Sequence, residues 1–225
     1  MTDKIKKSDK KLSIIFAADI FGYSALMRDN ELRTLNLLKK TRAITDPLIS
    51  KYNGRIANTA GDSIIAVFEG AENAIACSIE IQTRLAKANS KISPDKKMLF
   101  RIGLNVGEIY SNGNDILGDG VNIAARIEAQ AEQGAIAMSE NYYKLVSDQI
   151  AKMPTAVIQN VKLKNIKTPA TIYEIMSNRA VIANQKQKFG KKYRLKIALI
   201  VILGSLFASF AAALMVTKNL QLIGF

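Results

Sequence analysis

Two aspartates in the sequence stand where rigid elements could hold a divalent cation. Asp19 ends the apolar run KLSIIFAAD (residues 11–19), and Asp62 follows a glycine in the middle of RIANTAGDSIIAVF (residues 55–68). The first segment predicts a buried strand, and the second predicts a hairpin that turns at Gly-Asp. Mg²⁺ in proteins uses a few carboxylate oxygens plus substrate phosphates, and two such ions can activate an attacking oxygen and stabilise a leaving one. Taken singly, each aspartate is more simply explained as a strand terminator or a turn residue, and spacing alone does not pair them.

Asn122 and Arg126 form a second candidate group, at positions i and i+4 of GVNIAARIE (residues 120–128). This spacing places both side chains on one face of the predicted helix. An arginine fork suits a phosphate that is losing its leaving group, and an asparagine amide can orient a sugar hydroxyl. The alternatives are that Arg126 pairs with Glu128 or Glu132, or that it is simply solvated.

The elements that must position these residues alternate between strands and helices over residues 12–176. Their order, β-α-β-β-α-β with further elements after it, is that of a ferredoxin-like α+β sandwich. Apolar residues at helical spacing predict helices, and short apolar or alternating runs predict strands. The predicted helices are 31–52, 71–89 and 120–132, and the predicted strands are 11–19, the hairpin 55–68, 98–110, 134–139, 156–166 and 170–176.

Composition restricts the chemistry. The chain has no histidine, so carboxylates, lysine, arginine, tyrosine or metals must do any acid–base work. Its one cysteine, Cys77, allows no intrachain disulfide, and its position on the apolar face of the predicted helix 71–89 predicts a core side chain. The net charge of +13 is concentrated at residues 1–11 and 186–196 rather than on one helix, which argues against a nucleic-acid partner.

The C-terminal part predicts a membrane anchor. Residues 197–217 contain no charge over 21 positions, enough for a helix to cross a bilayer. Basic residues are dense in the linker 178–196, whereas only Lys218 lies in the tail 218–225, so the N-terminal domain is expected to stay in the cytoplasm. No apolar run follows the N-terminal lysines, so no cleavable signal peptide is expected. The expected location is the inner or plasma membrane, with one span.

Five segments in this order resemble the class III adenylate/guanylate cyclase catalytic domain. They are FAADIFGYSALM, GRIANTAGDSIIAVF, FRIGLNVGEIY, NDILGDGVNIAARIEAQAEQGAIAMS and LKNIKTPATIYEI. The resemblance covers residues 12–177, after a basic tail of residues 1–11. It implies a ferredoxin-like α+β cyclase sandwich, and a lyase that turns a nucleoside triphosphate into a cyclic nucleotide and pyrophosphate. The single membrane helix expected from the uncharged run would follow this sandwich.

The resemblance also implies roles for the candidate residues. Asp19 and Asp62 match the family's metal-binding aspartates, with the Ile20 carbonyl as a further ligand, and two Mg²⁺ or Mn²⁺ ions are implied. Asn122 matches the residue that orients the ribose, and Arg126 the one that stabilises the transition state.

Substrate recognition falls on three further positions. Asp115 matches the acid that reads the base, and Lys164 is the nearest match to the lysine that holds the phosphates, although Lys162 and Lys167 are close. Asn58 departs from the pattern, because adenylate cyclases usually have a lysine there. ATP is the expected substrate, with GTP or a pyrimidine triphosphate as alternatives.

Sites in this family form between two domains. One domain donates the aspartates, and the other donates the Asn–Arg helix and the base readers. This chain carries both sets, so the resemblance implies a homodimer with shared sites. The rival interpretation is a catalytically degenerate module that binds a nucleotide or only dimerises.

Overall fold

The computed structural model describes residues 10–112, 115–166 and 168–175. The chain divides into two units, residues 1–180 and 181–225, and the described residues all belong to the first. No helix in these described ranges is long and apolar enough to cross a membrane. The predicted linker 178–196, the span 197–217 and the tail 218–225 lie outside them.

The helices cover the predicted segments and add two short ones. The predicted helices correspond to α2 (Glu31–Lys51), α3 (Ala71–Ala88) and α4 (Asp119–Gln130). The helices α1 (Tyr23–Asp29) and α5 (Glu140–Val146), each of seven residues, have too few turns to show a period in the sequence. Two short 3₁₀ helices, η2 (Asn89–Lys91) and η3 (Pro94–Lys96), connect α3 to the next strand.

The strands of the described residues form one eight-stranded sheet in the order β2-β3-β1-β4-β6-β8-β7, with β5 paired to β4. The pair β4–β6 is parallel and the other pairs are antiparallel. The first strand begins at Lys10, so it includes two lysines that the sequence assigns to the basic tail. The strands are β1 (Lys10–Ile20), β2 (Gly54–Ala60), β3 (Ser63–Phe68), β4 (Phe100–Asn112), β5 (Asp115–Leu117), β6 (Ile136–Ser139), β7 (Thr155–Val161) and β8 (Ala170–Ile175).

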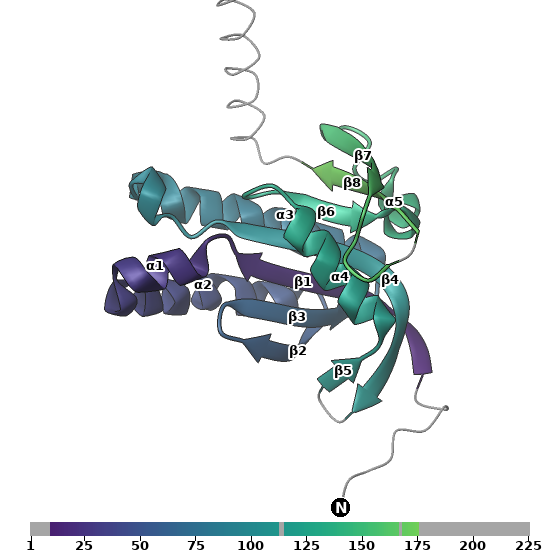
Figure 1. The fold of residues 1–225 in the computed structure, drawn as a ribbon, viewed down its shortest axis with the longest axis horizontal. Coiled ribbons are helices and arrows are strands. Elements are labelled where there is room, and N and C mark those ends of the chain that lie inside the picture. The colour runs from purple at the N-terminus through teal and green to yellow at the C-terminus, as the bar shows by residue number, and fades with distance from the viewer. Residues whose placement is uncertain (1–9, 113–114, 167, 176–225) are drawn as a thin grey trace, which may run out of the picture. The chain divides into compact units, whose positions relative to one another are not determined.

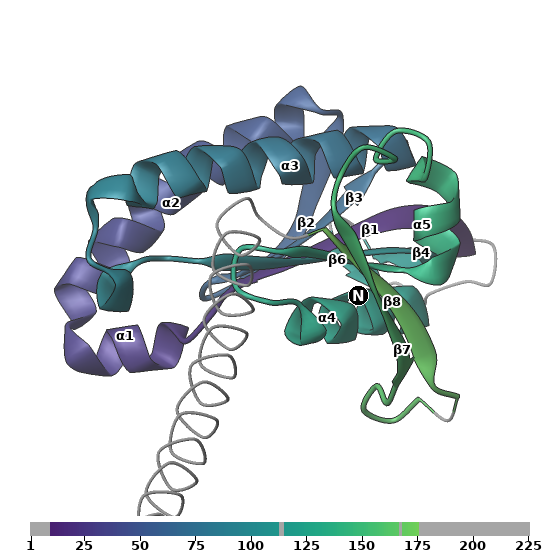
Figure 2. The ribbon, with the colours of Figure 1, turned by 90° about the horizontal axis from the view of Figure 1, so that it is seen from above.

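Helices cover both faces of the sheet, as the predicted α+β sandwich requires (Figure 1, Figure 2). The helices α2 and α3 lie on one face, and α4 lies on the other. Successive side chains of β1 point to opposite faces of the sheet. On one face, Phe16, Ala18 and Ile20 join the cluster under α2 and α3. On the other face, Ile15 and Ala17 join the cluster under α4. Asp19 continues the second series, so its side chain lies on the α4 face.

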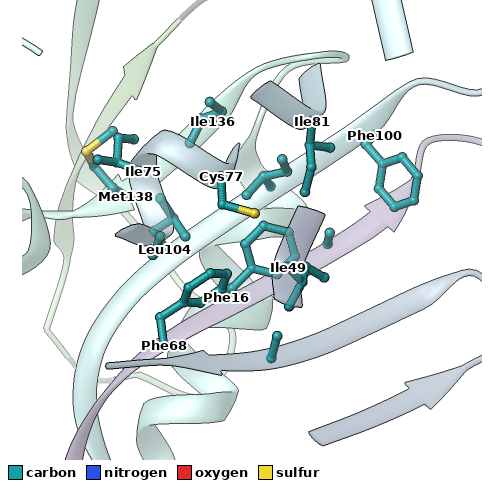
Figure 3. Close-up of a cluster of buried hydrophobic side chains, with 14 of the residues drawn as sticks. Phe16, Ile49, Phe68, Ile75, Cys77, Ile81, Phe100, Leu104, Ile136 and Met138 are labelled. Carbon is teal, nitrogen blue, oxygen red and sulfur yellow. The ribbon is translucent and has the colours of Figure 1, made fainter. Parts of the chain in front are cut away.

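The larger core lies between the sheet and the helices α2 and α3 (Figure 3). Phe16 and Phe68 meet there with ring centroids 6.0 Å apart. Cys77 is fully buried among these side chains, as its position on the apolar helix face predicts. This core keeps β1 and β3 side by side, and the two candidate aspartates stand at the ends of these strands.

The helix α4 lies directly on β4 because the strand presents small residues to it. A Cβ at Gly103 would overlap the Ala124 carbonyl oxygen and the Glu128 backbone nitrogen, and one at Gly107 would lie 2.9 Å from the Gly120 Cα. Between these two glycines, the Asn105 side chain donates a hydrogen bond of 3.0 Å to the Gly120 carbonyl. The strand therefore fixes where α4 lies, and with it the position of Asn122 and Arg126.

Replacing Gly103 with serine should force α4 away from β4. We expect a loss of about 3 kcal/mol in the free energy of unfolding, since the added atoms meet backbone that has no room to move. Gly70→Ser is the matched control, because a Cβ there lies 3.8 Å from its nearest neighbour and serine is a good residue to begin α3. Urea unfolding of both variants checks this, and equal stabilities would contradict the close helix–strand contact.

Candidate active site

The pairing register of β1 places Asp19 between two charged residues. On one side β1 pairs with β4, and Asp19 lies directly opposite Arg101. On the other side, the register ends with Ala18 opposite Ile64, which puts Ile20 level with Asp62. Residues opposite each other in a sheet share a face, so the carboxylate of Asp19 and the guanidinium of Arg101 both lie on the α4 face.

Asp62 reaches the end of β1 through its hairpin turn. The turn between β2 and β3 contains only Gly61 and Asp62, since Ala60 pairs directly with Ser63. Gly61 has φ +61°, which fits the first central position of a two-residue hairpin turn. The Asp62 carboxylate accepts a hydrogen bond of 3.1 Å from the Ile20 backbone N–H. The structure therefore brings together Asp19, Ile20 and Asp62, which the sequence could not pair.

The proximity of the Asp62 carboxyl changes the pKa of Asp19. Partial burial, a hydrogen bond shared with the neighbouring Asp62 carboxyl and the charge of Asp62 together raise the pKa of Asp19 to about 7. Arg101 opposes this effect only in part. Two carboxylates are thus held together against their mutual repulsion, which is a favourable arrangement for binding a cation.

Arg101 is a residue that motif spacing did not single out. Its Nη2 lies 3.4 Å from the Asp19 carboxylate, and its Nε lies 3.0 Å from Glu128 Oε1 on α4. Burial raises the pKa of Glu128 to about 7, and the charge of Arg101 counteracts this in part. Glu128 therefore does not pair with Arg126, the alternative raised by the sequence, because its partner is Arg101. The strand register places Arg101 opposite Asp19, and the packing of α4 on β4 brings Glu128 next to it.

Asn58 and Asp115 also come together. The Asn58 Nδ2 lies 3.3 Å from each carboxylate oxygen of Asp115, and the Ile116 backbone N–H donates 2.8 Å to Oδ1. Ala57 is left out of the ladder in a β-bulge between Ile56 and Asn58. Bulges of this kind redirect the side chain that follows them. The asparagine amide therefore donates to the acid beside it, where a lysine would place a charge.

Asn122 and Arg126 lie on the outer face of α4. Asn122 is exposed and Arg126 half-buried, and neither side chain makes a hydrogen bond or an ion pair within the described ranges. Glu128 lies about 200° further round the helix than Arg126. Because Glu128 faces Arg101 and Asp19, Arg126 points away from the aspartates of its own chain.

Lys164 is exposed in the connection between β7 and β8. Its neighbour Leu163 is buried in the cluster that contains Ile127 of α4 and Ala131, the residue directly after that helix. The connection is thus attached to the same helix as the Asn–Arg pair. No interaction joins Lys164 to the other candidate residues in the part of the chain that the structure describes.

The carboxylate pair fits a hard divalent cation. Within the described residues no group of three or more His, Cys, Asp or Glu side chains could hold a metal by itself. Mg²⁺ does not need such a cage, because it binds one or two carboxylates and completes its shell with water and substrate phosphates. Asp19 and Asp62 supply oxygens of this kind next to the Ile20 backbone.

The sequence and the fold match known proteins. The family described as adenylate and guanylate cyclase catalytic domain matches residues 5–198. A solved structure, an adenylate/guanylate cyclase/hydrolase from Silicibacter pomeroyi, is 36% identical with a TM-score of 0.71, covering 75% of this chain and 98% of that one.

Curated relatives are longer proteins. A putative adenylate cyclase from Rhizobium meliloti is 38% identical over 61% of this chain and 24% of its own length. An adenylate cyclase from Glutamicibacter nicotianae is 31% identical over 53% of this chain and 28% of its own length. The match therefore spans about a quarter of the length of each of these two relatives.

Asp19 should make the stability of the metal-free protein depend on pH. Its pKa is 3.8 in an ordinary environment and about 7 in the fold, so its contribution is fully present below about pH 4 and is lost as the pH rises through about 7. The Asp19→Asn variant should therefore lose less free energy of unfolding than the unaltered protein between about pH 5 and about pH 8. Part of the pH dependence should remain in the variant, because the pKa of Glu128 is also raised. Urea unfolding at both pH values checks this. The exposed Asp148→Asn is the control, and an unchanged pH dependence in Asp19→Asn would contradict the assignment.

Proposed function

The chain belongs to the adenylate and guanylate cyclase catalytic domain family, and from this we propose that it converts a nucleoside triphosphate, with ATP first, into a cyclic nucleotide and pyrophosphate. The observation that carries the proposal is the convergence of Asp19 and Asp62 beside the Ile20 backbone. In this reaction the ribose 3′ oxygen forms a bond to the α-phosphorus while the bond to the pyrophosphate oxygen breaks. The 3′-hydroxyl proton is released.

Asp19, Asp62 and the Ile20 carbonyl are the proposed ligands of two Mg²⁺ or Mn²⁺ ions. When bound, these ions supply charge that acidifies the hydroxyl and stabilises the triphosphate. The protein's own part is to hold the two carboxylates rigidly at the ends of paired strands. Positioning and electrostatics are the main contributions that proteins make to phosphoryl transfer.

Asp115 and Asn58 are the proposed base readers. The Asp115 carboxylate accepts from Asn58 and from Ile116 and retains acceptor capacity for an amino group such as that of adenine. Asn58 also keeps a second N–H and a carbonyl for the base. This favours ATP, while GTP and pyrimidine triphosphates are the alternatives that an assay must separate.

The remaining residues require a second copy of the chain. Arg126 and Asn122 face away from the aspartates of their own chain, so a homodimer would have to bring them to the partner's metal pair. There Asn122 would orient the ribose, Arg126 would stabilise charge on the reacting phosphate, and Lys164 would hold the phosphate tail. Each dimer would then contain two equal sites.

Residues 197–217 are the proposed membrane anchor, with the catalytic domain in the cytoplasm. The support is the run of 21 uncharged residues and the basic linker that precedes it. Anchoring would raise the effective concentration of the two copies in the plane of the membrane.

The full chain, supplied with Mn²⁺ or Mg²⁺ and each of the four triphosphates, should form cyclic AMP fastest from ATP. The products are identified by chromatography in the membrane pellet and the supernatant separately, and activity should sediment with the membranes. Faster turnover of another triphosphate would replace ATP as the proposed substrate. Activity confined to the supernatant would reject the proposed membrane anchor. No cyclic product from any triphosphate would favour the degenerate module.

Mixing two inactive variants should restore activity. Asp62→Ala removes a metal ligand, and Arg126→Ala should cost on the order of 3–4 kcal/mol of barrier, as for loss of one preorganised donor. Mixed dimers carry one intact site, so an equal mixture should recover about a quarter of the unaltered rate. Steady-state rates of the single variants and the mixture check this. A mixture no faster than its components would reject the shared site, and a loss below about tenfold in Arg126→Ala would reject its role.

A further inference from the structure

The guanidinium of Arg101 is shared between two carboxylates from different elements. Its Nε lies 3.0 Å from Glu128 Oε1 on α4, and its Nη2 lies 3.4 Å from Asp19 Oδ2 on β1. Its Nη1 donates 3.2 Å to the Ala129 carbonyl. Two of the three contacts come from α4, whereas the longest of them, with Asp19, is a hydrogen bond. Arg101 is thus shared between the helix and the candidate metal ligand.

The contact with Glu128 depends on charge and position rather than on an aligned hydrogen bond. Only 9% of the Glu128 side chain is exposed, yet neither its Oε1 nor the Arg101 Nε has a well-aligned partner. A buried ion pair without directional bonds holds its members less firmly than a bidentate one. The guanidinium can therefore move toward whichever carboxylate attracts it more.

The position of Glu128 is itself fixed. Its backbone lies against Gly103, where even a Cβ would overlap it. Phe21, which follows β1, also packs against Arg101, with the guanidinium carbon 5.6 Å from the ring centroid. Glu128 thus has a constant place from which to attract Arg101, and Asp19 competes for the same cation.

A divalent metal ion and the guanidinium would compete for the Asp19 carboxylate, one oxygen of which already contacts Arg101. We propose that Glu128 is a positioning residue for the metal pair, which by attracting Arg101 keeps Asp19 available to the metal. This rests on the proposed role of Asp19 and Asp62. Without the charge on Glu128, Arg101 would have a single acidic partner and would close onto Asp19. Metal binding would then require breaking a full ion pair.

The test is Mn²⁺ binding to the full chain without nucleotide, measured by calorimetry and by the electron paramagnetic resonance of free Mn²⁺. Glu128→Gln keeps the shape of the side chain and removes its charge. The matched control is Glu174→Gln, a glutamate that is also buried but accepts a hydrogen bond from the Glu132 backbone in another cluster. We expect the Mn²⁺ dissociation constant to rise about fivefold or more in Glu128→Gln and to change less than twofold in Glu174→Gln.

A second readout separates positioning from a merely structural role. Saturating Mn²⁺ should restore the cyclisation rate of Glu128→Gln, because only the affinity for the metal is altered. If Glu128→Gln does not fold, Glu128→Met fills the same volume without charge and carries the same expectation. The inference would be overturned if the Mn²⁺ dissociation constant of Glu128→Gln were unchanged, or if Mn²⁺ binding were weakened equally in Glu174→Gln. A cyclisation rate that saturating Mn²⁺ does not restore would also overturn it. Absence of Mn²⁺ binding in the unaltered protein would instead overturn the metal assignment on which it rests.

Discussion

The register between β1 and its two neighbours is the constraint on which the candidate site depends. It places Asp19 opposite Arg101 and puts Asp62 level with Ile20. Two ionised carboxylates repel each other, so this pair does not by itself hold the strands in register. Backbone ladders and the core around Phe16 and Phe68 hold the strands together and maintain this repulsion. Folding energy is thus used to keep two carboxylates close together before any ligand arrives.

The helix α4 extends this constraint to a second site. Its inner face is set by Gly103 and Asn105 of β4 and carries Glu128 toward the aspartates. Its outer face carries Asn122 and Arg126 toward solvent. One rigid helix therefore contributes to the fold and faces the two aspartates on its inner side, while its outer side carries the Asn–Arg pair. The separation of these two faces is the physical reason for expecting shared sites.

The sequence could predict the elements with a clear period and the residues in specific motifs. The long helices and the Gly-Asp hairpin were predicted correctly because hydrophobic spacing and turn chemistry are local properties. Arg101 and Asn105 were missed because their importance comes from pairing with residues far along the chain. Asn58 was recognised as a departure, but its hydrogen bond to Asp115 depends on a bulge that no local pattern shows. The short helices α1 and α5 lacked the length for a recognisable period. The roles of the site residues, like the membrane span, stay predictions.

The single cysteine of the chain has a consequence beyond the core that it helps to fill. Burial raises the pKa of the Cys77 thiol to about 12, and its side chain is inaccessible between α3 and the sheet. The folded protein therefore offers no reactive thiol to oxidants or alkylating reagents in the described domain, and the chain holds no other cysteine. Modification of this one atom would report the moment when α3 separates from the strands, so the molecule contains its own chemical indicator of opening.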